Sequence, residues 1–195
     1  MRIITGLFRS RVINLPSFFS DRPTTDMAKE SLFNIITNNF EYEEVRFLDL
    51  FSGSGGISYE MASRGCKDIT CVDLNRKYCE FINKSFKSMY PQKSPARVVN
   101  TDAFKFIENN PLNYDLIFAD PPYDMEGVEK IPEIIMNNPG LKPGAMLIVE
   151  HSAKTHFTDL VHIRDQRHYG KVNFSFYTKE EPQADDDAAE SESQD

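Results

Sequence analysis

The 195-residue chain has no tryptophan, only three cysteines, and no apolar run near the ~18 residues that a membrane helix needs. Cys66, Cys71 and Cys79 are odd in number and lack the spacing of a zinc site, so we expect reduced thiols and no metal. Arginines interrupt the first sixteen residues, where a signal peptide would need an apolar core, and we therefore expect a cytoplasmic protein. The apolar share of 40% is enough for one domain with its own core.

Basic residues are absent from the C-terminal end. Residues 180–195 hold eight acids and no base, which leaves 22 acids and 22 bases in residues 1–179. This low-complexity segment without aromatics is predicted to be a disordered acidic tail. Residues 1–22 instead hold four arginines and a single acid, so we expect a basic arm or hairpin that attracts phosphates. A solvated charged edge is the alternative. The predicted nucleic-acid contacts are Arg9, Arg11 and Arg22.

Residues 23–179 alternate between strand-like and helix-like segments. Buried strands are predicted at 45–51, 68–74, 96–100, 114–120 and within 141–151, and helices at 57–65, 76–89, 103–110 and 127–138. An earlier helix begins near the hydroxyls of Thr24 and Thr25. Strands joined through helices form a mostly parallel sheet that is covered on both faces. The last two strands, joined at Tyr169-Gly170, add an antiparallel hairpin, giving a seven-stranded α/β domain.

A glycine-rich turn follows the first predicted strand, in the segment from Asp49 to Gly56. Its glycines let the backbone turn sharply and approach a ligand closely. The third glycine of a dinucleotide fingerprint is replaced by Ser58, and the acid at position 49 suits a cationic ligand better than a pyrophosphate. An ordinary tight turn between strand and helix explains the glycines equally well.

Acids also stand at the ends of the second and third strands. Asp73 has the position of a carboxylate that accepts the ribose hydroxyls of a nucleoside, and Asp102-Ala103 can meet an adenine amino group. Each aspartate can equally cap the helix that follows it. Taken together, acids at three successive strand ends indicate a nucleoside pocket without phosphates.

The sharpest motif follows the fourth strand and reads Asp120-Pro121-Pro122-Tyr123. The prolines fix φ and remove two N–H donors, which leaves a rigid turn with outward carbonyls. Asp120 and the Pro121 carbonyl can accept hydrogen bonds from a planar exocyclic amine while its ring stacks on Tyr123. The alternative is a Pro-Pro strand terminator followed by a tyrosine that packs in the core.

These motifs, read in order as DLFSGSGG, VDL, TDA and DPPY, resemble those of S-adenosylmethionine-dependent amino-methyltransferases. The segments GLFRSRVINLP, RPTTDMAKESLFNII and RHYGKVNFSFY further resemble the bacterial RsmD-type family, which methylates the N2 amine of a guanine in 16S ribosomal RNA. The resemblance runs from Met1 to Tyr177. It departs from the family at Ser10, where members often have glycine.

The resemblance implies a Rossmann-like class I methyltransferase fold over residues 23–179, with S-adenosylmethionine as cofactor. It also implies ribosomal RNA or a small ribosomal subunit particle as partner, and we take the chain to be a monomer. The catalytic residues that it implies are Asp120, Pro121, Pro122 and Tyr123. The cofactor-binding residues are Asp49, Phe51, Gly53, Gly55, Asp73, Leu74, Asp102 and Ala103.

Three other functions fit part of the pattern. DPPY permits a DNA adenine-N6 or cytosine methyltransferase, but 195 residues leave no room for a target-recognition domain. The glycine turn suggests a nicotinamide-dependent oxidoreductase, which the missing third glycine disfavours. A non-catalytic RNA-binding module would not need an intact DPPY.

Overall fold

The computed structural model describes residues 1–19, 24–159 and 161–180. Arg22 and residues 181–195 of the predicted acidic tail lie outside the described residues. Among the described residues, no helix is both long and apolar enough to cross a membrane.

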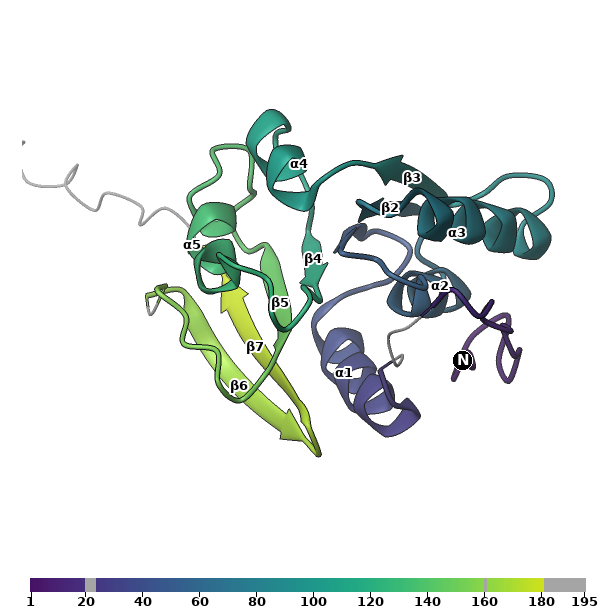
Figure 1. Ribbon diagram of the computed structural model, residues 1–195, viewed down its shortest axis with the longest axis horizontal. Helices are drawn as coiled ribbons and strands as arrows, with labels where there is room; N and C mark the ends of the chain where they lie inside the picture. The colour runs from purple at the N-terminus through teal and green to yellow at the C-terminus, as the bar shows by residue number, and fades with distance from the viewer. Residues whose placement is uncertain (20–23, 160, 181–195) are drawn as a thin grey trace, which may run out of the picture.

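Seven strands form one sheet in the order β3-β2-β1-β4-β5-β7-β6 (Figure 1). The strands are β1 Arg46–Leu50, β2 Asp68–Asp73, β3 Ala96–Asn100, β4 Leu116–Ala119, β5 Met146–His151, β6 Ile163–Tyr169 and β7 Val172–Thr178. The first five are parallel, whereas β7 pairs antiparallel with β5 and β6 pairs antiparallel with β7. The predicted mostly parallel sheet with a C-terminal antiparallel hairpin is confirmed.

Helices cover both faces of the sheet, because its central strands are apolar on both sides. The helices are α1 Asp26–Asn39, α2 Gly56–Ser63, α3 Arg76–Met89, α4 Ala103–Asn109 and α5 Ile131–Met136. One core packs α1, α2 and α3 against side chains such as Phe47 and Phe118. The other packs α4 and α5 against residues such as Leu50 and Ile117 on the opposite face. Consecutive residues of a strand thus serve different cores.

Helix boundaries follow local capping signals. Thr25 is the N-cap of α1, where its hydroxyl accepts a hydrogen bond from the Ala28 amide, as the hydroxyls of this segment predicted. The single helix predicted at 127–138 is wrong: a 3-10 turn over Val128–Lys130 precedes the short α5. Pro132 has no amide hydrogen to donate and so belongs in a first helical turn. α5 ends at Met136 with Asn137 as its C-cap, and beyond it the Asn138 side chain accepts a hydrogen bond from the Gly140 amide and donates one to the Ile107 carbonyl.

The N-terminal segment folds back on itself through an antiparallel bridge between Arg2 and Val12. It lies beside α2 and α3 at one end of the molecule (Figure 1). Gly6 makes the closest approach, with φ of +86° and no room for a side chain, since a Cβ atom would lie 1.9 Å from the Ser63 carbonyl oxygen. The buried carboxylate of Glu60 accepts hydrogen bonds from the amides of Ile4 and Thr5 at 2.7 and 2.9 Å. These contacts fix the arm against α2.

Candidate active site

The strand order reverses between β1 and β4, which places the switch point of the sheet at their carboxyl ends. In open α/β sheets, ligands bind in the crevice at such a point. Leu50 and Ala119 are paired in the register of these strands, and the Asp120 amide donates a hydrogen bond to the Leu50 carbonyl at 3.4 Å. The glycine turn after β1 and DPPY after β4 therefore begin side by side, as the sequence predicted.

The turn after β1 is held in a conformation that favours glycine. Phe51, Gly53 and Gly55 all have positive φ, of 60°, 51° and 80°. Gly55 is the N-cap of α2 and has no room for a side chain, because a Cβ atom would lie 2.9 Å from Cζ of Tyr59. Phe51 is the exception in this set, since a non-glycine residue with positive φ marks strain, which is typical of ligand-binding turns.

Asp49 lies beneath this turn, with an exposed fraction of 2%. The Ser58 hydroxyl donates a hydrogen bond to its carboxylate at 2.5 Å, so the residue in place of the third fingerprint glycine has a partner of its own. Burial raises the pKa of Asp49 to about 7, against the lowering effect of the Ser58 hydrogen bond. Asp49 is therefore shielded from solvent beneath the turn.

Asp73 reaches from the end of β2 to the glycine turn. One carboxylate oxygen accepts a hydrogen bond from the Gly53 amide at 2.8 Å, and the other accepts one from the Asn75 amide at 2.7 Å. The helix cap of α3 is Asn75, so the capping alternative does not hold for Asp73. Leu74, which follows it, is 70% exposed.

Asp102 is the N-cap of α4, where its carboxylate accepts a hydrogen bond from the Lys105 amide at 3.0 Å. The capping alternative for this residue is therefore realised. Ala103 is buried in the core beneath α4. Of the predicted cofactor residues, these two lie farthest along the sheet from DPPY, beyond β3 at its edge.

The DPPY turn is rigid and partly open to solvent. Pro121 is buried, and the Pro122 carbonyl accepts a hydrogen bond from the Met125 amide at 3.0 Å, which closes the turn. The Tyr123 side chain is 63% exposed, so its ring is available to stack and does not pack in the core. The alternative of a packing tyrosine is thus excluded.

The comparisons with known proteins bear on the whole chain. The family described as "Conserved hypothetical protein 95" matches residues 1–178. The chain belongs to this family. Ribosomal RNA small subunit methyltransferase D from Haemophilus influenzae is 32% identical over 152 residues, covering 77% of this chain and 78% of that protein. The Escherichia coli K12 protein of the same name is 30% identical over 150 residues, covering 77% of this chain and 74% of that protein.

A solved structure agrees with these relatives. Escherichia coli yhhF superposes with a TM-score of 0.77 at 27% identity, covering 92% of this chain and 98% of that one. The resemblance to the RsmD-type family is therefore confirmed, and with it the Rossmann-like methyltransferase fold.

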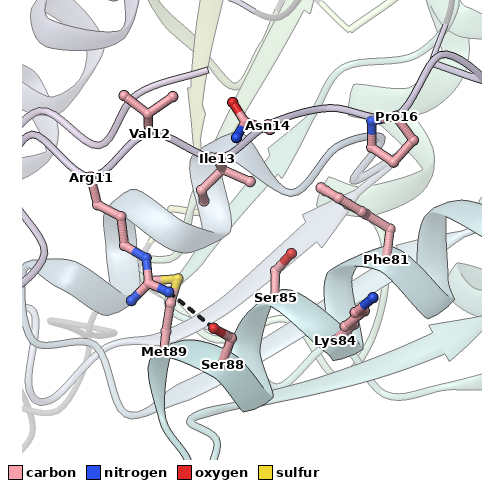
Figure 2. Close-up of a pocket in the computed structure, with 10 residues that line it drawn as sticks. All are labelled: Arg11, Val12, Ile13, Asn14, Pro16, Phe81, Lys84, Ser85, Ser88 and Met89. Atoms are coloured by element: carbon pink, nitrogen blue, oxygen red, sulfur yellow. Dashed lines mark hydrogen bonds between the residues drawn. The ribbon is translucent and has the colours of Figure 1, made fainter.

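A groove of about 360 Å³ separates the N-terminal segment of this family member from α3. Figure 2 shows Arg11 reaching across it, with its guanidinium donating a hydrogen bond to the Ser88 hydroxyl at 3.0 Å. Lys84 and Ser85 line the α3 side, while Arg9 is exposed nearby in the sequence. The third predicted contact, Arg22, is not among the described residues. No lining residue of this groove belongs to the predicted cofactor set.

The cysteines are structural. Cys66, Cys71 and Cys79 are buried and free, and burial raises the pKa of each thiol, that of Cys66 to about 11. They belong to the core, as their positions around the second strand indicated. Their raised pKa values leave little of the reactive thiolate form. Within the described part of the chain, no cluster of three or more His, Cys, Asp or Glu side chains is arranged to hold a metal ion.

One residue next to DPPY, Glu150, was missed in the sequence. Glu150, near the end of β5, is buried with an exposed fraction of 4%, and the Thr24 hydroxyl donates a hydrogen bond to its carboxylate at 3.1 Å. Burial raises the pKa of Glu150 to about 7. The signal was present, because an acid inside the apolar run LIVEH has the same strand-end position as the other acids. His151, its neighbour, instead bonds Ser152 and Ser175.

Proposed function

We propose that this chain transfers a methyl group from S-adenosylmethionine to the exocyclic N2 amine of a guanine in small-subunit ribosomal RNA. Membership of the RsmD family supports a methyltransferase that acts on ribosomal RNA. The observation that carries the proposal for this site is the hydrogen bond between the Asp120 amide and the Leu50 carbonyl. Because this bond joins the start of DPPY to the end of β1, it supports an amine-binding corner next to a cofactor turn.

The residues around the glycine turn fit S-adenosylmethionine. At Gly53 a Cβ atom would meet nothing closer than the Phe51 carbonyl oxygen at 3.8 Å, so the backbone there is open to a ligand, while the positive φ of Gly53 and Gly55 shapes the turn. Asp73 lies at the rim with carboxylate oxygens suited to ribose hydroxyls, and exposed Leu74 offers an apolar surface to the adenine ring. The buried charge of Asp49 favours a sulfonium over a neutral sulfur. When bound, the cofactor supplies a methyl group made electrophilic by the sulfonium.

The DPPY residues orient the nucleophile. A guanine amine is a poor nucleophile, because its lone pair is delocalised into the ring. Hydrogen bonds from its two N–H groups to the Asp120 carboxylate and the Pro121 carbonyl would turn that lone pair toward the methyl group. Asp120 also accepts the proton that the amine loses after transfer, and Tyr123 stacks on the base.

The arm supplies the attraction for RNA that a neutral body lacks. Arg9 and Arg11 belong to the N-terminal segment, and Lys84 of α3 lines the same groove as Arg11 (Figure 2). Together they form a local basic surface for backbone phosphates. Arg22 belongs to the same proposed surface by its sequence position alone. We propose a monomer that acts in the cytoplasm, where bacterial ribosomes are assembled.

The proposal is tested with small-subunit particles from a strain that lacks this protein. Purified chain and radiolabelled S-adenosylmethionine are added, and the labelled nucleoside is identified by mass spectrometry. We expect N2-methylguanosine as the product. N6-methyladenosine, or label found only in DNA, would contradict the proposed substrate. Binding of NADH in place of S-adenosylmethionine, measured by calorimetry, would contradict the proposed chemistry.

A further inference from the structure

Glu150 is a buried carboxylate for which the proposed methyl transfer so far has no use. Among the described residues, its carboxylate accepts one hydrogen bond, from the Thr24 hydroxyl to Oε2. Burying a carboxylate costs free energy unless its lone pairs are satisfied. The remaining oxygen, Oε1, therefore offers acceptor capacity at a position where a partner would be strongly favoured.

The position of Glu150 is next to the proposed amine site. Strands β4 and β5 are parallel neighbours in which Ala119 pairs with Val149, so Asp120 and Glu150 are the next residues on each strand. Tyr123 belongs to the same turn as Asp120, and its pKa is raised by burial and, to a lesser extent, by the charges of Glu150 and Asp120. The three side chains gather at one corner of the sheet, at its carboxyl edge.

Two adjacent acidic side chains match the edge of one base in particular. Guanine presents two kinds of donor side by side, the N1–H and the N2 amine, whereas adenine presents a bare N1 acceptor beside its amine. An ionised carboxylate accepts hydrogen bonds and donates none, so above about pH 7, where Glu150 is mostly ionised, it attracts guanine N1–H and repels the N1 lone pair of adenine.

We propose that Glu150 accepts a hydrogen bond from N1–H of the target guanine and so selects guanine, while Asp120 and the Pro121 carbonyl hold the N2 amine. Thr24 is a positioning residue in this scheme, because its hydroxyl fixes Oε2 and turns Oε1 toward the base. The inference rests on the proposed function and deepens it, since family membership alone does not say how the base is chosen.

The test compares guanine with 2-aminopurine at the target position of an otherwise identical RNA. 2-Aminopurine keeps the 2-amine but has no N1–H, so its N1 lone pair would face the carboxylate. We expect the wild-type chain to prefer guanine in kcat/KM by about tenfold to a hundredfold, which is the range for one mismatched base contact. In Glu150→Gln, the amide can donate to N1 of 2-aminopurine, and we expect the preference to fall by about tenfold.

Further variants separate selection from folding. Thr24→Val should lower the guanine preference, and Thr24→Ser, which keeps the hydroxyl, should restore it. Glu44→Gln is the matched control. Glu44 is exposed just before the amino end of β1, away from the carboxyl ends of the strands, and its substitution should leave the preference unchanged.

The outcomes also separate this inference from the proposed function. If Glu150→Gln slows both substrates by the same factor, the glutamate is structural and the inference is overturned, while guanine methylation by the wild type stands. If the wild type methylates neither guanine nor 2-aminopurine but does methylate adenine, the proposed function fails, and the inference fails with it.

Discussion

The carboxylate of Asp73 accepts a hydrogen bond from the Gly53 amide at 2.8 Å, which ties the last residue of β2 to the turn that follows β1. A second bond, from the Asn75 amide, fixes the same carboxylate from the other side. One side chain thus shapes the glycine turn and stands at the rim of the proposed cofactor site. The turn and the ribose acceptor are preorganised together.

Replacing this carboxylate should weaken cofactor binding. Asp73→Ala removes the Gly53 contact and the proposed acceptor of ribose hydroxyls, and we expect the Kd for S-adenosylhomocysteine to rise by about tenfold to a hundredfold, since bonds to a charged group are worth about 1.5–3 kcal/mol. Isothermal titration calorimetry measures the change. Asp68→Ala, at the exposed start of β2, is the control. Equal affinity in Asp73→Ala and wild type would refute the role.

The pKa of Asp49 predicts a pH dependence that depends on the ligand's charge. Burial raises this pKa from 3.8 to about 7, so the carboxyl is largely neutral at pH 6 and ionised at pH 8. Only the ionised form attracts a sulfonium. Affinity for S-adenosylmethionine, relative to the neutral-sulfur product S-adenosylhomocysteine, should therefore rise from pH 6 to pH 8. Asp49→Asn should flatten this ratio, and a ratio independent of pH in the wild type would refute the electrostatic role.

The same shift has the opposite effect on stability. Between pH 4 and pH 7 the folded chain holds a proton on Asp49 that the unfolded chain has lost, so the contribution of this group to the free energy of unfolding falls as pH rises through this window. Asp49→Asn does not titrate, and its stability relative to the wild type should therefore increase from pH 5 to pH 8. Denaturant titrations at the two pH values measure the difference.

Among the charged residues that contact the N-terminal segment, Glu60 should cost the most stability when it is replaced. It is fully buried, accepts two arm amides, and pairs with Arg64 at 2.9 Å and with buried Lys29 at 3.8 Å. Glu60→Ala leaves those cations unpaired, and we expect a loss of about 3–5 kcal/mol in the free energy of unfolding. Urea denaturation measures it. Glu30→Ala, on the exposed side of α1, should change stability by less than about 0.5 kcal/mol. A similar loss of stability in the two variants would contradict this role of Glu60 in holding the arm.

Ser10 should gain stability from the glycine that its family often has there. Its φ is 67°, a conformation that costs a residue with a side chain about 1–2 kcal/mol. Glycine avoids this cost but loses about 0.4–1 kcal/mol through the entropy of the unfolded chain, so Ser10→Gly should be stabilising by up to about 1 kcal/mol. Ser17→Gly, at a position without positive φ, should only destabilise. A lower melting temperature for Ser10→Gly than for wild type would contradict backbone strain at Ser10.

The sheet could be predicted from the sequence because its strands are short apolar runs separated by helix-length segments. The neighbouring positions of the glycine turn and DPPY followed from the same pattern, since parallel strands share a carboxyl edge. The short length of α5 was not predicted, because the apolar spacing of residues 127–138 did not show the break between the 3-10 turn Val128–Lys130 and Ile131. Nor could the partner of the buried Asp49 be predicted, because Ser58 reaches it from α2, the helix that follows the turn.

Glu150 shows a second limit of what can be predicted from the sequence. Its acid is visible in LIVEH, but only the β4–β5 pairing places it beside Asp120, and only the fold brings Thr24 to it from the start of α1. The role of Asp102 was left open between capping and binding, and the structure shows the cap. Local patterns thus predicted the elements, whereas contacts between elements decided the roles.

Asp120 is the residue on which the proposed chemistry depends most directly. Single-turnover methylation of small-subunit particles and calorimetric binding of S-adenosylhomocysteine are measured for Asp120→Ala and for Asp124→Ala, an exposed acid in the same turn. We expect Asp120→Ala to lose at least about a hundredfold in methyl-transfer rate, within the range for a proton-accepting group, with cofactor affinity unchanged. Asp124→Ala should match the wild type in both. A full transfer rate in Asp120→Ala would contradict the account.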